Sequence, residues 1–139
     1  MTVTATPRPT GHPGYTETLP CETQSARAAR RLVLVALAVW GQEQLTDDGQ
    51  LIVTELVANA AQHTSSHLIR VRITYQDDAF VRIGVVDKSR RLPTATPAGD
   101  GDTSGRGLAL INALATQWGC DPLPWGKRVW ADLTCERNP

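Results

Sequence analysis

Apolar residues recur along this chain with two different periods, and each period predicts a different kind of element. Residues 25–40 are rich in Ala, Arg and Leu and are followed by a glycine, which predicts a helix. A second helix is predicted to begin at Asp47 or Asp48, since either residue can cap it, and to end near His63. A third helix is predicted over residues 106–117.

Alternation of apolar and polar residues predicts the strands. Residues 68–75 and 80–87 alternate on either side of the Asp77–Asp78 pair, a pattern that predicts a β-hairpin. Residues 127–134 alternate again and are predicted to close the sheet, and residues 15–20 are predicted to form a short edge strand. The expected fold class is therefore α+β: a two-layer α/β sandwich with a mixed, mostly antiparallel sheet and helices on one face.

The length of 139 residues suits a single domain. Residues 1–13 are rich in Pro and Thr, and we expect a flexible N-terminal tail there, before a folded domain over residues 14–135. Residues 88–104 show no periodicity, which predicts a long loop of the kind that is often functional. The apolar run at 32–40 is too short to span a bilayer, so a buried helix is expected there.

The charge and the cysteine content argue against several classes of function. Lys plus Arg and Asp plus Glu are equal, at 14 residues each, so the chain has no net charge that would attract nucleic acid or an anionic membrane. The three cysteines show no paired spacing, which argues against a disulfide framework or a cysteine metal site. We therefore expect a cytoplasmic protein that binds neither nucleic acid nor membrane.

The first candidate for chemistry is a polar stripe on the second helix. Glu55 is the one charged residue between positions 49 and 69, and at helical spacing it shares a face with Asn59, Gln62 and His63. The stripe either faces water or lines a pocket. A solvated helix face normally carries several charges, and this one carries a single carboxylate.

The second candidate is Asp87, which ends a predicted strand. In a period-2 pattern it lies on the same side as Val81, Ile83 and Val85, so it should point toward the core. A buried carboxylate needs a partner, because its desolvation is costly. Asp87 either binds loop amides at the strand end or accepts a hydrogen bond from a ligand's amino group.

The third candidate is a glycine-rich segment at the predicted start of the third helix. Gly105 and Gly107 flank Arg106 there, and the free N–H groups of a helix start can bind phosphate. The same pattern is also typical of a simple turn. Residues 100–111 resemble the start of an EF-hand loop, but Ile111 occupies the position of the bidentate ligand, which argues against a calcium site.

Taken in order, these three features resemble the superfamily of gyrase, heat-shock chaperone and histidine-kinase ATPases, which share the Bergerat nucleotide-binding fold. The chain is most similar to the small anti-sigma-factor serine kinases and their actinobacterial relatives. The resemblance covers about residues 15–134 and is specific in the order and spacing of its segments: ARAARRLV, LIVTELVANAAQH, VVDKSRRLP, GRGLALINALATQWG and GKRVWADL.

The resemblance implies a role for each candidate residue. Glu55 matches the carboxylate that orients or deprotonates the attacking hydroxyl, and Asn59 matches the amide oxygen that binds Mg²⁺. His63 lies where a polar residue can approach the phosphates, and Asp87 matches the acceptor of the adenine amino group. The phosphate-binding turn and the lid over it match Gly105, Arg106, Gly107, Leu108 and residues 88–104.

Two departures from the family pattern lie on the adenine side. The usual Asp-x-Gly-x-Gly after the strand is here DKSRR, beginning at Asp87, with both glycines absent. The threonine often found on the last strand is expected to be replaced by Arg128.

The function that the resemblance implies is that of an ATP- and Mg²⁺-dependent serine/threonine protein kinase. Such a kinase phosphorylates a small antagonist protein and holds a sigma factor when that antagonist is phosphorylated; relatives commonly form homodimers. The alternative is a non-catalytic module that binds proteins under nucleotide control or without nucleotide. The missing glycines favour the module, whereas Glu55 favours the kinase, because a binder needs no base. A plain α+β domain with an unrelated pocket would require all three motifs to be coincidental.

Overall fold

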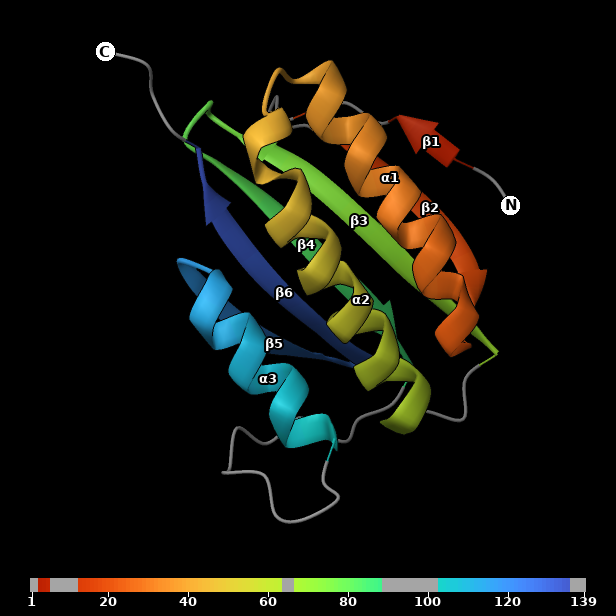
Figure 1. Ribbon diagram of the computed structural model, residues 1–139. Coiled ribbons are helices and arrows are strands. Elements are labelled where there is room, and N and C mark those ends of the chain that lie inside the picture. The colour runs from red at the N-terminus through yellow and green to blue at the C-terminus, as the bar shows by residue number, and fades with distance from the viewer. Residues whose placement is uncertain (1–2, 6–12, 64–66, 89–102, 136–139) are drawn as a thin grey trace.

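The computed structural model describes residues 3–5, 13–63, 67–88 and 103–135. Its sheet has six strands in the order β1-β2-β3-β4-β6-β5 (Figure 1). The strands are β1 Val3–Ala5, β2 Gly14–Pro20, β3 Leu68–Gln76, β4 Phe80–Asp87, β5 Gln117–Leu123 and β6 Gly126–Thr134. The helices are α1 Ala26–Val39, α2 Thr46–His63 and α3 Thr103–Leu114, and short 3₁₀ turns at Thr23–Ser25 and Glu43–Leu45 precede α1 and α2.

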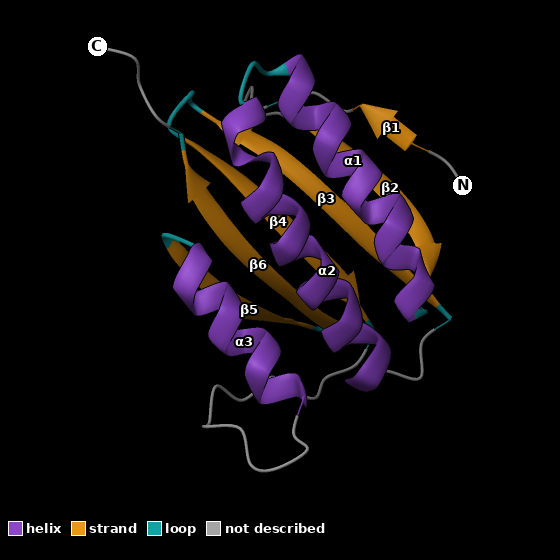
Figure 2. Cartoon of the chain, in the orientation of Figure 1, coloured by secondary structure: helices purple, strands orange, loops and turns teal. Residues whose placement is uncertain are grey.

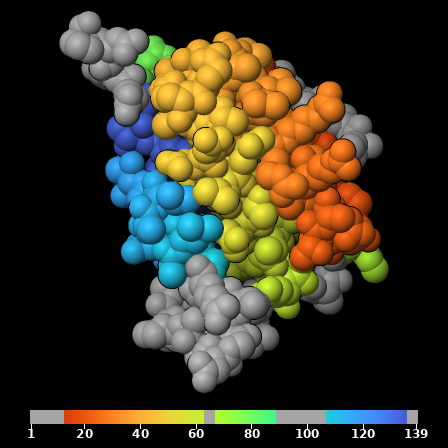
Figure 3. Space-filling view, in the orientation of Figure 1, coloured from red at the N-terminus to blue at the C-terminus, as the bar shows by residue number. Residues whose placement is uncertain are grey.

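All three helices pack on one face of the sheet, which makes the molecule a two-layer sandwich (Figure 2). They lie side by side with α2 in the middle (Figure 3). The predicted α+β fold class is therefore confirmed. The sheet is antiparallel at each pairing between described strands, so the expectation of a mixed sheet was wrong in that detail.

Helix α1 forms where the sequence predicts it, because its apolar residues recur at helical spacing. Its inward face is buried and consists of Ala26, Ala29, Leu32, Val33, Ala36 and Leu37. The helix ends before a glycine with a φ of +68°, a conformation that glycine adopts without strain.

Helix α2 begins at Thr46, one residue before the predicted start. Asp47 and Asp48 lie inside its first turn, so neither caps it as predicted. Their carboxylates there still favour the helix, since the helix start carries partial positive charge. Gly49 lets α2 approach α1 closely: a Cβ at this position would lie 2.9 Å from Cγ1 of Val33.

The β3–β4 hairpin is confirmed. Asp77 and Asp78 have φ values of 53° and 56°, in the left-handed region that a tight hairpin turn requires. The N–H of Ala79 donates to the carbonyl of Gln76 at 2.9 Å. Asp is among the residues that tolerate this conformation, which explains why a DD pair can replace the more usual glycine-containing turn.

The C-terminal part of the sheet differs from the prediction. Helix α3 starts at Thr103 and ends at Leu114, three residues short of the predicted end, and β5 follows it. Strand β6 therefore lies between β4 and β5 and does not close the sheet. The sequence of β5 contains glycine and proline and lacks clear apolar alternation, so no periodicity revealed it.

The N-terminal strand was also placed differently. Strand β2 was expected at the sheet edge, but β1 pairs with it on its outer side. The remainder of the predicted tail, residues 1–2 and 6–12, and most of the predicted loop, residues 89–102, lie outside the described part of the chain. No helix among the described residues is both long and apolar enough to cross a bilayer.

Gly126 offers a test of how tightly β6 is held against the end of β4. A Cβ at Gly126 would overlap the backbone carbonyl oxygen of Asp87, whereas one at Gly84, in the middle of β4, would meet its nearest atoms at 3.7 Å. We expect Gly126→Ala to lower the free energy of unfolding by about 2–3 kcal/mol because the strand must move.

The matched control is Gly84→Ala, which should change the free energy of unfolding by no more than about 0.5 kcal/mol. Denaturant unfolding of the two variants checks this. Equal stabilities would contradict the close approach of Gly126 to Asp87.

Candidate functional site

The predicted site residues gather at one end of the sandwich. The C-terminal half of α2, the first turns of α3 and the end of β4 meet at this end (Figure 1). The side chains of His63 and of residues 103–106, which include Gly105 and Arg106, are outside the described part of the structure. The site is therefore built from the described side chains of α2, α3, β4 and β6.

Glu55 on α2 lies directly against α3. A Cβ at Gly107 would lie 2.7 Å from Oε2 of Glu55, so the carboxylate occupies space that only a glycine leaves open. Glu55 itself is half-buried. The structure thus brings together two residues that are 52 positions apart in the sequence and were predicted separately.

The glycine-rich segment lies within α3 and not in a turn before it. Since α3 begins at Thr103, Gly105 and Gly107 are in its first two turns, and Leu108 is buried in the core with 2% of its surface exposed. The first turn of a helix leaves its N–H groups unpaired, which suits an anion. Leu108 can contribute only backbone to such a site.

Asn59 lies one turn beyond Glu55 and is 6% exposed. Its Oδ1 atom is buried and has no hydrogen-bond partner among the described residues. An unpaired buried carbonyl costs about 1–3 kcal/mol, so its retention calls for a ligand. Mg²⁺ prefers oxygen ligands and usually takes few of them from the protein, so a single amide oxygen beside bound phosphates fits this ion.

The described residues do not form an all-protein metal site. No group of three or more His, Cys, Asp or Glu side chains among them could hold an ion. Asn59 is buried whereas Gln62 is exposed, so the polar stripe of α2 is not uniformly solvated. This distribution favours the pocket interpretation of the stripe over the solvated one.

Asp87 points inward at the end of β4, as its position in the alternation predicts, and is 2% exposed. Its partner was not predicted. Lys127 lies opposite it on β6, is fully buried, and places Nζ 3.7 Å from Oδ2 of Asp87. A buried charge of either sign needs such compensation. The site therefore contains a buried ion pair in addition to Glu55 and Asn59.

With this geometry in place, comparison with known proteins gives the family. A family model described as "Histidine kinase-like ATPase domain" matches residues 19–131. The chain belongs to the histidine kinase-like ATPase domain family.

The chain is also similar to one curated relative and to two solved structures. The chain is 38% identical over 71 residues to an uncharacterized protein of Streptomyces coelicolor, a match that covers 50% of this chain and 65% of that protein. It shares its fold with the crystal structure of the RsbU and RsbW domains of a Mycobacterium tuberculosis protein, with a TM-score of 0.67 and 22% identity over 91% of this chain and 33% of that one.

A second structural neighbour is the histidine kinase domain of a blue-light activated histidine kinase of Erythrobacter litoralis. The TM-score is 0.52 and the identity 17%, over 84% of this chain and 62% of that one. The chain thus spans less than two thirds of the length of each of these three proteins. At these identities the two structures show the fold alone.

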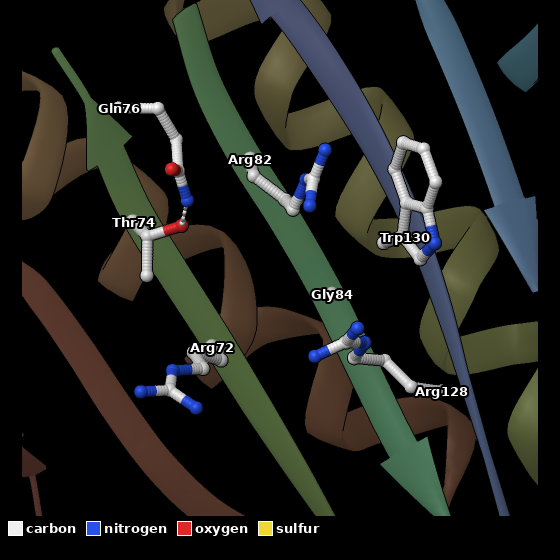
Figure 4. Close-up of a pocket in the computed structure, with 7 residues that line it drawn as sticks. All are labelled: Arg72, Thr74, Gln76, Arg82, Gly84, Arg128 and Trp130. Atoms are coloured by element: carbon white, nitrogen blue, oxygen red, sulfur yellow. Dashed lines mark hydrogen bonds between the residues drawn. The ribbon is translucent and has the colours of Figure 1, made fainter. Parts of the chain in front are cut away.

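The histidine kinase-like ATPase domain departs from the predicted layout on β6. Arg128 was expected near the adenine side, but successive side chains of a strand point to opposite faces, and Lys127 takes the inward position. Arg128 instead lines a hollow of about 30 Å³ with Arg72, Arg82 and Trp130 (Figure 4). The parity of Lys127 with Val129 and Ala131 is the signal that identifies it.

Two thiols of this domain lie within electrostatic reach of Asp87. Burial raises the pKa of the Cys21 thiol, and the negative charge of Asp87 raises it further. Burial also raises the pKa of the Cys120 thiol, where the positive charge of Lys127 opposes the effect and the carboxylates of Asp121 and Asp87 add to it. Both cysteines therefore stay protonated at neutral pH.

Asn59 offers a test of whether its environment is built for a ligand. Leucine has a shape similar to asparagine and carries no polar side-chain atoms. In the absence of nucleotide, we expect the free energy of unfolding of Asn59→Leu to lie between the wild-type value and about 1 kcal/mol above it, because an unpaired buried oxygen is removed.

The control is Asp132→Leu, since Asp132 is also buried but accepts hydrogen bonds from Arg82 at 2.8 and 3.0 Å and from Gln117 at 2.7 Å. This variant should lose about 2–4 kcal/mol. Denaturant unfolding measures both, and a loss of similar size in Asn59→Leu would show that its oxygen is paired in the folded chain.

Proposed function

We propose that this chain binds ATP with Mg²⁺ and acts as a serine/threonine protein kinase of the anti-sigma-factor type. The observation that carries the proposal is the position of Glu55 against Gly107, one turn away from the buried, unpaired Oδ1 of Asn59. The family supports ATP binding, and the RsbW domain in the Mycobacterium tuberculosis structure supports the anti-sigma context.

Each residue then has a role in the transfer. Asn59 holds Mg²⁺ through Oδ1, and the ion supplies charge neutralisation for the phosphates. The N–H groups of the first turn of α3, which includes Gly105 and Arg106, bind phosphate oxygens. His63 is the polar residue that the family resemblance assigns to the phosphates. Asp87 accepts a hydrogen bond from the amino group of the base. Most of the barrier is lowered by positioning and charge, as in phosphoryl transfer generally.

Glu55 acts as the general base in this scheme. It accepts the proton of a Ser or Thr hydroxyl as that oxygen forms its bond to the γ-phosphorus and the bond to the ADP oxygen breaks. Gly107 matters because it leaves room for the carboxylate to face the phosphate-binding turn. The proposed acceptor is a small antagonist protein, and the proposed second partner is a sigma factor. We further propose that the kinase is cytoplasmic and forms a homodimer.

A second candidate function is a non-catalytic protein-binding module, nucleotide-gated or nucleotide-free. The ion pair between Asp87 and Lys127 favours this module. The carboxylate of Asp87 already lies 3.7 Å from an ammonium group, so it has a partner without a bound nucleobase. The retained carboxylate at Glu55, directed at α3, favours the kinase.

Replacing Glu55, the proposed general base, distinguishes the kinase from the binding module. We expect Glu55→Gln to keep its affinity for Mg-ATP and to lose roughly a hundredfold in the rate of γ-phosphate transfer, to a candidate antagonist protein or to water. Glu43→Gln, at an exposed glutamate remote from α3, is the matched control and should react at the wild-type rate.

Radiolabelled ATP and single-turnover conditions report the transfer, and calorimetry reports the binding. A Glu55→Gln protein with full transfer rate would contradict the base assignment. A wild-type protein that binds Mg-ATP without transferring phosphate to any acceptor would establish the binding module instead.

A further inference from the structure

The sheet face that carries no helix has a hollow near its middle, and the proposed mechanism gives this hollow no task. All three helices pack on the other face (Figure 2), and an antiparallel sheet commonly leaves one face to water. The hollow has a volume of about 30 Å³, which is room for about two oxygen-sized atoms. We call it the outer hollow; its lining includes Arg72, Thr74, Arg82, Gly84, Arg128 and Trp130 (Figure 4).

The register of the sheet leaves the floor of the outer hollow without a side chain. Gly84 lies between its cross-strand partners, Arg72 on β3 and Trp130 on β6. Two large residues therefore flank a position that has no Cβ. A Cβ added at Gly84 would lie 3.7 Å from its nearest atoms, which is ordinary contact distance, so the space above this glycine is open.

A second glycine and an ion pair hold the walls of the outer hollow in place. The indole of Trp130 lies over Gly119 on β5, where an added Cβ would be 2.8 Å from Cζ2 of the ring. The guanidinium carbon of Arg82 lies 4.1 Å from the centroid of the same ring. Asp132 accepts hydrogen bonds of 2.8 and 3.0 Å from Arg82. The walls are thus fixed before any ligand arrives, which lowers the entropic cost of binding.

The charged residues that line the outer hollow are all arginines, namely Arg72, Arg82 and Arg128. Two carboxylates of the same sheet face, Asp132 and Asp121, pair with Arg82 and Arg128. Neither carboxylate is part of the lining. Three guanidinium groups therefore surround a space that no acidic side chain lines, and such a space attracts an anion.

Two hydrogen-bond donors at the outer hollow lack an acceptor. Nε of Arg128 and Nε1 of Trp130 are buried, and neither donates a hydrogen bond to another described residue. The hydrogen bond from Arg128 is the main cause that lowers the pKa of the Asp121 carboxyl; Trp130 lowers it less, and its N–H completes no hydrogen bond there. Thr74 is 3% exposed and accepts a hydrogen bond of 2.9 Å from Gln76, so its own hydroxyl proton is available to a second acceptor. Buried donors without acceptors are costly, and an anion in the hollow would supply the acceptors.

We propose that the outer hollow is an oxyanion site that binds a phosphate group. Its donors come from β3, β4 and β6, so they surround a ligand from several directions, as a tetrahedral ion requires, whereas a carboxylate accepts its hydrogen bonds in one plane. Three guanidinium groups also suit a dianion better than a monoanion. The inference goes beyond the proposed nucleotide site, which lies on the helix side of the sheet, and it does not depend on that site.

NMR titration of the full chain with inorganic phosphate tests the proposal. The chain has four tryptophans, and the indole N–H of each gives its own signal; Trp130→Phe identifies the signal of Trp130 by its loss. At constant pH and ionic strength, we expect this signal to shift with half-saturation at about 1 mM phosphate or below. Acetate, a planar monoanion, should need at least roughly tenfold higher concentration.

Two variants and a matched control assign the binding to the outer hollow. Gly84→Ala places a methyl group on its floor without a clash, and Arg128→Met removes one guanidinium group and its Nε donor. Each should raise the half-saturating phosphate concentration roughly tenfold or more. Arg70→Met is the control, since Arg70 is an exposed arginine of the same sheet face that does not line the hollow, and it should bind phosphate like the wild type.

Phosphoserine is the second probe and identifies the source of the phosphate group. Half-saturation within roughly tenfold of inorganic phosphate would support a site for phosphate carried on a larger molecule, whereas binding of inorganic phosphate alone would support a site for the free ion.

Three results would overturn the proposal. These are no shift of the Trp130 signal up to about 20 mM phosphate, equal half-saturation by acetate and phosphate, or unchanged phosphate binding in both Gly84→Ala and Arg128→Met. Each of these results concerns the helix-free face of the sheet and leaves the proposed nucleotide function standing. A failure to bind ATP would likewise leave the oxyanion site standing.

Discussion

The packing of α2 between the sheet and α3 is the constraint on which the site depends. One face of α2 is apolar and supplies Ile52, Val53, Leu56, Val57 and Ala60 to the core. The adjoining face carries Glu55 and Asn59, and it meets α3 at a glycine. Burying polar groups in this position costs free energy that an apolar interface would avoid. The fold tolerates the cost at one end of the sandwich, where the ends of three elements converge.

The two sides of the site differ in how far they follow the family pattern. On the phosphate side, the carboxylate, the amide and the glycine-rich helix start are all present, and Glu55 and Gly107 are in contact. On the base side, the two glycines after Asp87 are missing, and the carboxylate is paired with the buried Lys127. The phosphate side is built from α2 and α3, and the base side is built from β4 and β6. Because the two sides come from different elements, the residues of one side can change while those of the other are kept. The departures beside Asp87 therefore leave in place the groups on α2 and α3 that are proposed for phosphoryl transfer.

Short-range sequence patterns correctly predicted the features that depend on neighbouring residues in the chain. The helix over residues 25–40, the hairpin with its DD turn and the inward direction of Asp87 all follow from periodicity and turn chemistry. Strand β5 escaped prediction because its position is set by pairing with β6 and not by an apolar alternation of its own. The contact between Glu55 and Gly107 is likewise a product of tertiary packing. The inward position of Lys127 could have been predicted from the sequence, because the same alternation that directs Asp87 inward applies to Lys127 on the neighbouring strand.

The central claim is that the oxygen of Asn59 binds Mg²⁺ that comes with a nucleotide, and calorimetric titration with ATP tests it most directly. The wild-type protein should bind ATP in the presence of Mg²⁺ and lose roughly tenfold or more in affinity when the ion is chelated. Asn59→Ala should show the weak binding of the chelated wild type whether or not Mg²⁺ is present. Equal Mg²⁺-dependent binding in both proteins, or no ATP binding by the wild type at millimolar concentration, would contradict the account.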